Sequence, residues 1–209
     1  MIRSTLHNHT TLCDGRSSPE EMAQAAVAAG FSDLGFSGHS PAPFDAGSLR
    51  DEAAYRETIL KLREKYAGTL RVHVGMEQDY LAPVQRRSDW DYRIGSVHFL
   101  ERDGEHHAVD WDETRFGALL AAFGGPDHAV RAYYASVTDM VRTQRPDIVG
   151  HFDLIGKFNA DERFFREDES YRGIALEALD VVIESGCVPE VNASGFNYQI
   201  GRASCRERV

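Results

Sequence analysis

Metal-binding side chains recur at the ends of predicted strands in this sequence of 209 residues. Five strand-like segments are each followed by an imidazole or a carboxylate. These groups belong to His7, His9, His39, Glu77, His98 and His151. In a parallel α/β barrel the carboxyl ends of the strands gather on one face, where active sites of that architecture lie. Because imidazole nitrogen and carboxylate oxygen suit Zn, Mn or Fe(II) and suit Ca poorly, the pattern predicts a centre for such ions.

The spacing and expected burial of these residues point the same way. His7 and His9 are two residues apart in an extended segment, so both imidazoles project to one side and can bind one ion. Burying Glu77 would be costly unless it met cations, and a position between two metals would provide them. A single histidine at a strand end is more often structural, but the same pattern at five strands argues against chance. We assign structural or surface roles to the others: His73, His106, His107 and His128.

Strand-like and helix-like segments alternate along the chain, which is typical of βα units around a parallel sheet. We expect helices at residues 18–30, 51–66, 113–123, 127–143 and 171–185. We expect strands at 31–37, 70–76, 92–99, 147–149 and 188–191, with a turn at 103–104. Because no repeat or linker interrupts them, residues 1–199 are expected to form one domain.

Two of these helices carry an apolar stripe that should face a sheet. In the first helix the stripe is predicted from residues at helical spacing, namely Met22, Ala25, Ala26 and Ala29. In the second helix it is predicted from Tyr55, Ile59 and Leu62. Both helices are therefore expected to pack against strands.

Composition narrows the class of protein. An apolar share of 42% in 23.4 kDa is sufficient for a substantial core, and a charged share of 27% argues against disorder. No stretch approaches the roughly 18 apolar residues of a membrane span, and no secretory leader precedes His7, so we expect a cytoplasmic protein. A formal charge of -10 opposes attraction to phosphate backbones, so neither nucleic acid nor membrane is an expected partner. Cys13, Cys187 and Cys205 are too few for a disulfide framework or a Cys-based zinc site.

The last ten residues, 200–209, resemble the in-frame translation of a DNA sequencing adapter more than an evolved segment. We therefore expect a non-native tail on a chain that lacks its own C-terminus. The alternative, an ordinary basic tail with three arginines, stays open.

Six segments resemble the PHP metallo-phosphoesterases (polymerase and histidinol phosphatase superfamily), and within them the histidinol-phosphatase branch. The similarity covers residues 1–199. The segments are 6–15, 38–40, 75–80, 91–99, 150–154 and 190–195. The resemblance implies a distorted (β/α)7 TIM-like barrel, incomplete here at the C-terminus, with two or three divalent ions from among Zn, Mn and Fe.

The resemblance also implies roles for seven metal ligands. These are His7 and His9 for a first ion, Glu77 as a bridge to a second ion held by His98 and His151, and Asp14 with His39 for a third. The family closes its site with a late Asp-x-His, which nothing after Ser194 supplies. The shells of the first and third ions would therefore each lack one ligand in this chain.

Three hypotheses about function follow. The first is metal-dependent hydrolysis of a phosphomonoester, with no catalytic residue beyond the metal ligands; the resemblance implies the conversion of L-histidinol phosphate to L-histidinol and phosphate in histidine biosynthesis. Lys157, six residues after His151, is a candidate for binding the substrate phosphate, although an exposed lysine is the commoner outcome. The second is a PHP-type phosphodiesterase or nuclease, which the acidic composition disfavours. The third is a catalytically impaired metal-binding fragment. The sequence leaves the oligomeric state open.

Overall fold

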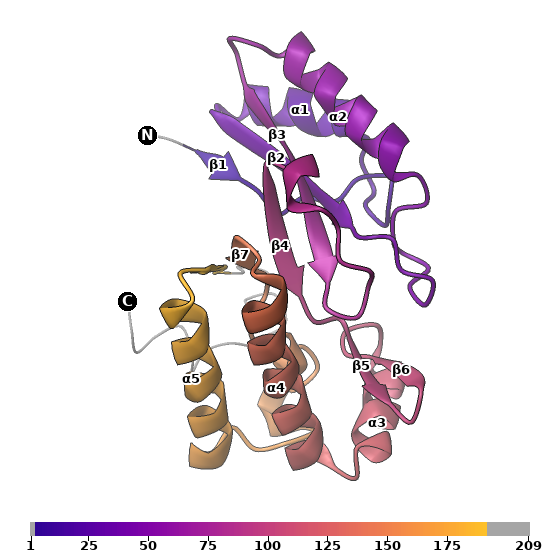
Figure 1. Cartoon of the computed structure of the whole chain (residues 1–209), viewed down its shortest axis with the longest axis vertical. Helices are drawn as coiled ribbons and strands as arrows, with labels where there is room; N and C mark the ends of the chain where they lie inside the picture. Colours follow the sequence, from indigo (N-terminus) through magenta and orange to yellow (C-terminus); the bar gives the residue numbers. More distant parts are fainter. Residues whose placement is uncertain (1–2, 192–209) are drawn as a thin grey trace. The chain divides into compact units, whose positions relative to one another are not determined.

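The computed structural model describes residues 3–191, which fall in two compact units, one up to Ile94 and one from Gly95 onward. Strands alternate with helices in both units, which confirms the predicted α/β class (Figure 1). Most of the segment at 190–195 and the whole tail at 200–209, about which predictions were made, lie outside the described residues.

The first unit is a parallel sheet with helices in its crossovers. Its elements are β1 (Ser4–Thr5), α1 (Pro19–Ala28), β2 (Asp33–His39), α2 (Glu52–Lys65), β3 (Arg71–Asp79), the 3-10 turn η1 (Arg87–Asp89) and the start of β4 (Tyr92–Ser96). Strand β2 pairs with β1 on one side and with β3 on the other. The register sets His39, the last residue of β2, opposite Glu77, two residues before the end of β3, so two predicted site residues lie side by side.

Local sequence explains both helices of this unit. Ser18 forms a capping box with Glu21 at the start of α1, and Asp51 accepts a hydrogen bond from the Ala54 N–H at the start of α2. The predicted stripe of α2 is confirmed, because its tyrosine, isoleucine and leucine are all buried. The predicted stripe of α1 is partly wrong: Ala25 and Ala29 are exposed. The helix instead turns Pro19, Ala23 and Ala26 inward.

Tyr92 fastens the segment that leads to the first predicted metal ligand. Its hydroxyl donates to the carbonyl of Leu6, and it also lies 3.2 Å from the carbonyl of Phe36. The ring lies against two glycines, since a Cβ on Gly35 would be 2.3 Å from the Tyr92 hydroxyl and one on Gly75 would be 2.2 Å from Cζ. Both glycines are therefore required by close packing.

The second unit joins the end of β4 to a hairpin, three helices and a short parallel pair of strands. Its elements are β5 (Phe99–Arg102), β6 (Glu105–Ala108), α3 (Glu113–Ala122), α4 (Pro126–Gln144), β7 (Ile148–Val149), the 3-10 turns η2 (Leu154–Gly156) and η3 (Ala160–Glu162), α5 (Glu169–Glu184) and β8 (Val188–Pro189). Strand β7 pairs in parallel with β8, and the Gly150 N–H donates to the Gly95 carbonyl at 2.9 Å.

The predictions for the hairpin region are partly confirmed. The turn predicted at 103–104 is confirmed, with positive φ at Asp103 and Gly104. The single strand predicted at 92–99 is two strands, β4 and β5.

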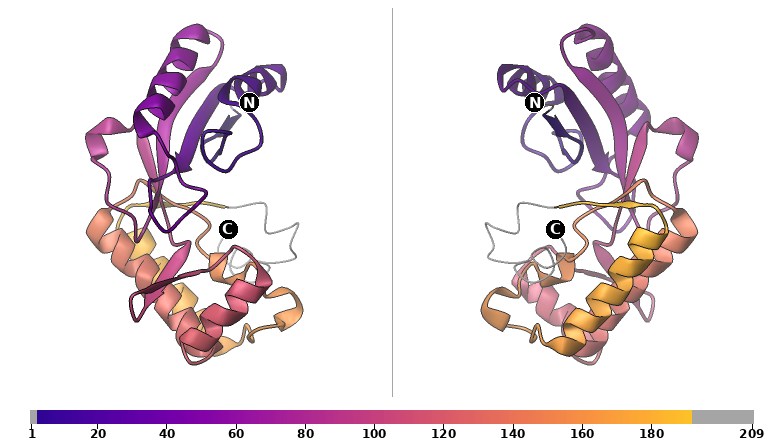
Figure 2. Two further views of the ribbon diagram at one scale, coloured as in Figure 1. Left: turned by 90° about the vertical axis from the view of Figure 1, so that its right-hand side faces the viewer. Right: turned by 90° about the vertical axis from the view of Figure 1, so that its left-hand side faces the viewer.

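Helices α4 and α5 lie side by side (Figure 2), and the hydroxyls of Tyr134 and Tyr171 lie 3.2 Å apart between them. Among residues 3–191 no helix is both long and apolar enough to cross a membrane.

The contact between Gly75 and Tyr92 gives a stability prediction. Gly75→Ala should lower the free energy of unfolding by about 1–3 kcal/mol, because the new methyl group must displace the buried Tyr92 ring. Gly173→Ala is the control: this helical glycine has nothing within 4 Å of the added Cβ, so the change should stabilise by about 0.5–1 kcal/mol. Urea unfolding followed by circular dichroism measures both. Equal effects of the two substitutions would contradict the packing argument.

Candidate metal centre

A buried carboxylate lies at the centre of a histidine cluster in the first unit. Glu77, on β3, has 0% of its side chain exposed. Its Oε2 atom lies 3.1 Å from His7 Nε2, 3.1 Å from His9 Nε2 and 3.2 Å from His39 Nδ1. Such a charge is costly to bury unless cations or strong donors surround it. The three imidazoles provide that environment around a single oxygen.

Asn8 sets the direction of the two N-terminal histidines. Its backbone N–H donates to Ser37 Oγ at 3.0 Å, and the Ser37 N–H donates back to the Asn8 carbonyl at 2.9 Å. Its side-chain amide donates to the Gly35 carbonyl at 2.8 Å. The segment after β1 is therefore held along β2, with His7 and His9 on either side of the anchored asparagine. Asn8 was not predicted as a site residue, although its place between two histidines is a usable signal.

Asp14 approaches the same cluster from a tight loop. Its carboxylate oxygens lie 3.1 Å from His9 Nδ1 and 3.5 Å from His39 Nε2. The loop turns back at Gly15, whose N–H donates to the Thr10 carbonyl at 2.9 Å. A Cβ on Gly15 would lie 2.4 Å from the backbone of His9, so only glycine fits there. Half of the Asp14 side chain stays exposed, so it forms the solvent-facing edge of the cluster.

The charges in this cluster are strongly coupled. Burial lowers the pKa of His9, but hydrogen bonds with Asp14, Cys13 and Glu77 outweigh burial and raise it to about 12. Burial raises the pKa of Asp14, but hydrogen bonds from His39 and His9 outweigh it and hold the pKa well below its usual range. At neutral pH the cluster therefore contains an anionic Asp14 and a protonated His9, and a metal ion would take the place of that proton.

The donor set fits a divalent ion such as zinc. Two ligands bound tetrahedrally at about 2.0–2.1 Å lie about 3.3–3.4 Å apart. The nitrogen–oxygen separations around Glu77 are 3.1–3.2 Å. Two groups of the first unit each bring three ligand atoms within 4.8 Å of one another. They are His9 with His39 and Glu77, and His9 with Cys13 and Asp14.

A second pair of imidazoles occurs in the second unit. His98 follows β4, His151 follows β7, and their Nε2 atoms lie 3.3 Å apart. His151 has φ of 21°, a conformation that non-glycine residues rarely adopt, and its N–H donates to Glu190 Oε2 at 2.8 Å. The separation of the two nitrogens matches that of two imidazoles sharing one tetrahedral ion, about 3.3–3.4 Å. Glu190 was noted only as part of a motif, and its contact with His151 gives it a structural role.

Lys157 lies against Asp110, which was not among the predicted site residues. Lys157 Nζ donates to the backbone carbonyl of Asp110 at 2.8 Å and lies 3.2 Å from its Oδ2 atom. The Lys157 side chain is only 25% exposed. It is therefore not a solvent-exposed surface lysine, which is the commoner outcome for this residue type. Burial raises the pKa of Asp110, but the nearby His98, Lys157 and His151 outweigh burial and lower it. Nothing in the local sequence marks Asp110 as a partner of these residues.

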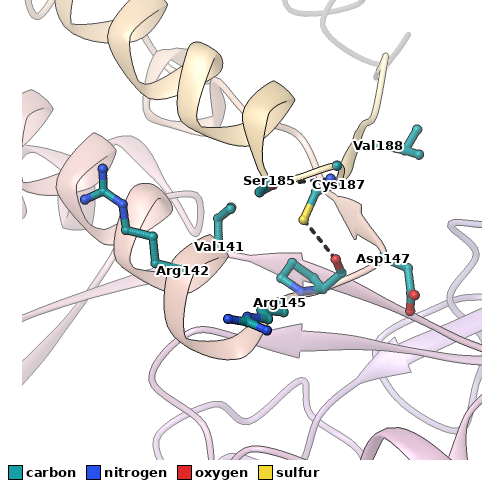
Figure 3. Close-up of a pocket in the computed structure, with 9 residues that line it drawn as sticks. Val141, Arg142, Arg145, Asp147, Ser185, Cys187 and Val188 are labelled. Carbon is teal, nitrogen blue, oxygen red and sulfur yellow. Dashed lines mark hydrogen bonds between the residues drawn. The ribbon is translucent and has the colours of Figure 1, made fainter.

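The remaining histidines lie outside both clusters. His73 Nε2 lies 3.0 Å from Asp33 Oδ1, which is a structural contact, and His106 and His128 are exposed. A pocket in the second unit lies at the ends of α4 and α5 (Figure 3). There the Cys187 thiol donates to the Pro146 carbonyl at 3.0 Å. None of the predicted site residues lines this pocket.

Comparison with known sequences identifies relatives of this chain. A family model described as the PHP domain matches residues 5–194. A protein of Deinococcus radiodurans named "Probable histidinol-phosphatase" is 34% identical, over 94% of this chain and 75% of its own length. The histidinol-phosphatase of Bacillus subtilis is 29% identical, over 91% of this chain and 80% of its own length.

Two solved structures share the fold. The crystal structure of hisK from Listeria monocytogenes matches with a TM-score of 0.79 and 23% identity, over 94% of this chain and 85% of that one. Histidinol phosphate phosphatase from Lactococcus lactis subsp. lactis, complexed with zinc, L-histidinol and phosphate, matches with a TM-score of 0.65 and 19% identity, over 94% and 74%. At these identities the likeness shows the fold alone, and it confirms the expected TIM-like α/β architecture.

The central position of Glu77 gives a prediction about metal affinity. Glu77→Gln should lower the affinity for zinc by more than about 100-fold, because it removes the buried charge on which three imidazoles converge. Competition with a chromophoric chelator measures this affinity. Glu57→Gln, an exposed carboxylate on α2, is the matched control and should leave it unchanged. An unchanged affinity in Glu77→Gln would contradict the assignment.

The protonation of His9 gives a prediction about pH. In the metal-free chain its raised pKa contributes stability that is complete below pH ~6.5 and is lost as pH rises toward 12. Zinc must displace this proton, so binding at pH 8 should release about one more proton from the wild type than from His9→Gln. Calorimetry in buffers of different ionisation enthalpy counts the protons. His73→Gln, outside the cluster, should behave as the wild type; equal release from all three chains would disprove the charged state of His9.

Proposed function

Because this chain belongs to the PHP domain family, whose model matches residues 5–194, we propose that it is a metal-dependent histidinol-phosphatase. The reaction is hydrolysis of L-histidinol phosphate to L-histidinol and phosphate in histidine biosynthesis. The observation that carries the proposal is the convergence of His7, His9 and His39 on the buried carboxylate of Glu77. The names of the bacterial relatives, and the zinc, L-histidinol and phosphate in the lactococcal structure, support this substrate.

We infer that two or three divalent ions, zinc, manganese or iron, are bound by the predicted ligands. In the first unit these ligands are His7, His9, Asp14, His39 and Glu77, and in the second unit they are His98 and His151. When bound, such ions lower the pKa of a water molecule and stabilise the charge that develops on phosphate oxygens.

The residues of the chain itself supply binding, orientation and charge. Glu77 contributes the buried negative charge that holds cations in place. Asp14 reaches both His9 and His39, so it fixes the orientation of two imidazoles as well as offering a ligand oxygen. Lys157 carries the positive charge that we assign to the phosphate group of the substrate. The sequence offers no covalent nucleophile with a phosphate-binding loop, so direct attack by water on phosphorus is the proposed route.

Substrate preference tests the proposal. The chain, loaded with zinc or manganese, should release phosphate from L-histidinol phosphate with a kcat/KM at least about tenfold above that for simple alkyl phosphates. Bis(p-nitrophenyl) phosphate tests the phosphodiesterase alternative, and Glu77→Gln is the inactive control. Equal turnover across the panel would reject the substrate, and preference for the diester would reject the reaction. Bound metal without any turnover would favour the impaired fragment.

A further inference from the structure

The hairpin of the second unit brings Asp110 next to His98. Strands β5 and β6 pair along their whole length, and the Val109 N–H then donates to the His98 carbonyl at 2.8 Å. Val109 is fully buried, so this return point is held by packing as well as by the hydrogen bond. Asp110 is the next residue. The hairpin therefore delivers a carboxylate to the segment that carries a predicted metal ligand.

A chain of tight turns brings Lys157 to the same place from His151. The Leu154 N–H donates to the His151 carbonyl at 2.9 Å, and the Lys157 N–H donates to the Leu154 carbonyl at 2.9 Å. Lys157 then reaches Asp110 through the two contacts of 2.8 and 3.2 Å described above. The ion pair thus joins the loop after His98 to the loop after His151, the two residues whose imidazoles face each other at 3.3 Å.

The ion pair with Asp110 leaves the Lys157 ammonium able to donate a further hydrogen bond to an anion. An ammonium group has three N–H donors, and Asp110 takes two of them with its carbonyl and its carboxylate. A lysine side chain is flexible, and holding it by two acceptors removes much of the freedom that a ligand would otherwise have to restrict. Within the described part of the chain the ammonium also lies 5.6 Å from the centroid of the Phe158 ring, a contact that leaves its third N–H donor for an anion with several acceptor oxygens.

We propose that Asp110 is a positioning residue, which holds the Lys157 ammonium beside the His98–His151 pair so that it binds the phosphate group of the substrate. The proposal rests on the proposed function and adds to it a residue that binds no substrate itself. It also predicts the direction in which the affinity for phosphate changes when the Asp110 carboxylate is removed. An aspartate that is merely close to the phosphate repels it, so its removal would tighten phosphate binding; an aspartate that positions Lys157 assists binding, so its removal weakens it.

Binding of inorganic phosphate to the zinc-loaded full chain tests the direction of this change in affinity. Asp110→Asn and Lys157→Met should each raise the Kd for phosphate about tenfold, measured by calorimetry. Because Asp110 acts through the lysine, the double variant should bind phosphate no more weakly than Lys157→Met alone. Lys157→Arg, which keeps the charge, should recover most of the affinity. Tighter or unchanged binding in Asp110→Asn, or additive losses in the double variant, would overturn the proposal.

Matched controls separate this role from others. Lys61 and Glu57 form an exposed ion pair on α2, so Lys61→Met and Glu57→Gln make the same charge changes away from the site and should leave the Kd unchanged. Zinc content is measured in every variant, and loss of zinc in Asp110→Asn would make Asp110 a ligand and overturn the positioning role. A wild type that binds phosphate but does not hydrolyse L-histidinol phosphate would reject the proposed function alone.

Discussion

The first unit must compensate the charge of Glu77, a carboxylate that it buries completely. An unpaired carboxylate at 0% exposure would cost several kcal/mol, so the surrounding chain must supply positive charge or donors at the correct distance. That requirement explains why segments far apart in the sequence end at one point. The parallel register sets His39 beside Glu77, and the anchored segment after β1 adds two further imidazoles. The proposed metal binding and the need to neutralise a buried charge would therefore use the same residues.

Much of this arrangement could be predicted because it depends on periodicities that are local in the chain. His7 and His9 are two residues apart in one short segment, His39 is the last residue of a mostly buried strand, and Glu77 lies near the end of the next. Strong amphipathic signals were also reliable: Tyr55, Ile59 and Leu62 of α2 are all buried. The prediction for the alanine-rich helix α1 was less accurate, because alanines give a weak apolar signal and the buried face is shifted toward Ala23.

The contacts that escaped prediction are those made between distant segments. Asp110 has no local pattern, and it meets Lys157 only because a hairpin and a series of tight turns bring together residues 47 apart in sequence. The division of the predicted strand at 92–99 was missed for a related reason: the run is almost uniformly buried, so apolar periodicity gives no mark where β4 ends and β5 begins. The role of a side chain that depends on a contact between distant segments can be assigned only from the three-dimensional structure.

The packing of Tyr92 has a consequence for how this protein can change over evolutionary time. The ring occupies room that Gly35 and Gly75 leave open on neighbouring strands, and its hydroxyl reaches the carbonyls of Leu6 and Phe36. The three positions therefore form one steric unit. Lineages that keep the tyrosine are bound to retain minimal side chains at both partners, whereas a small aliphatic residue at 92 would remove the ring and release both at once. Substitutions at 35, 75 and 92 should thus be correlated rather than independent.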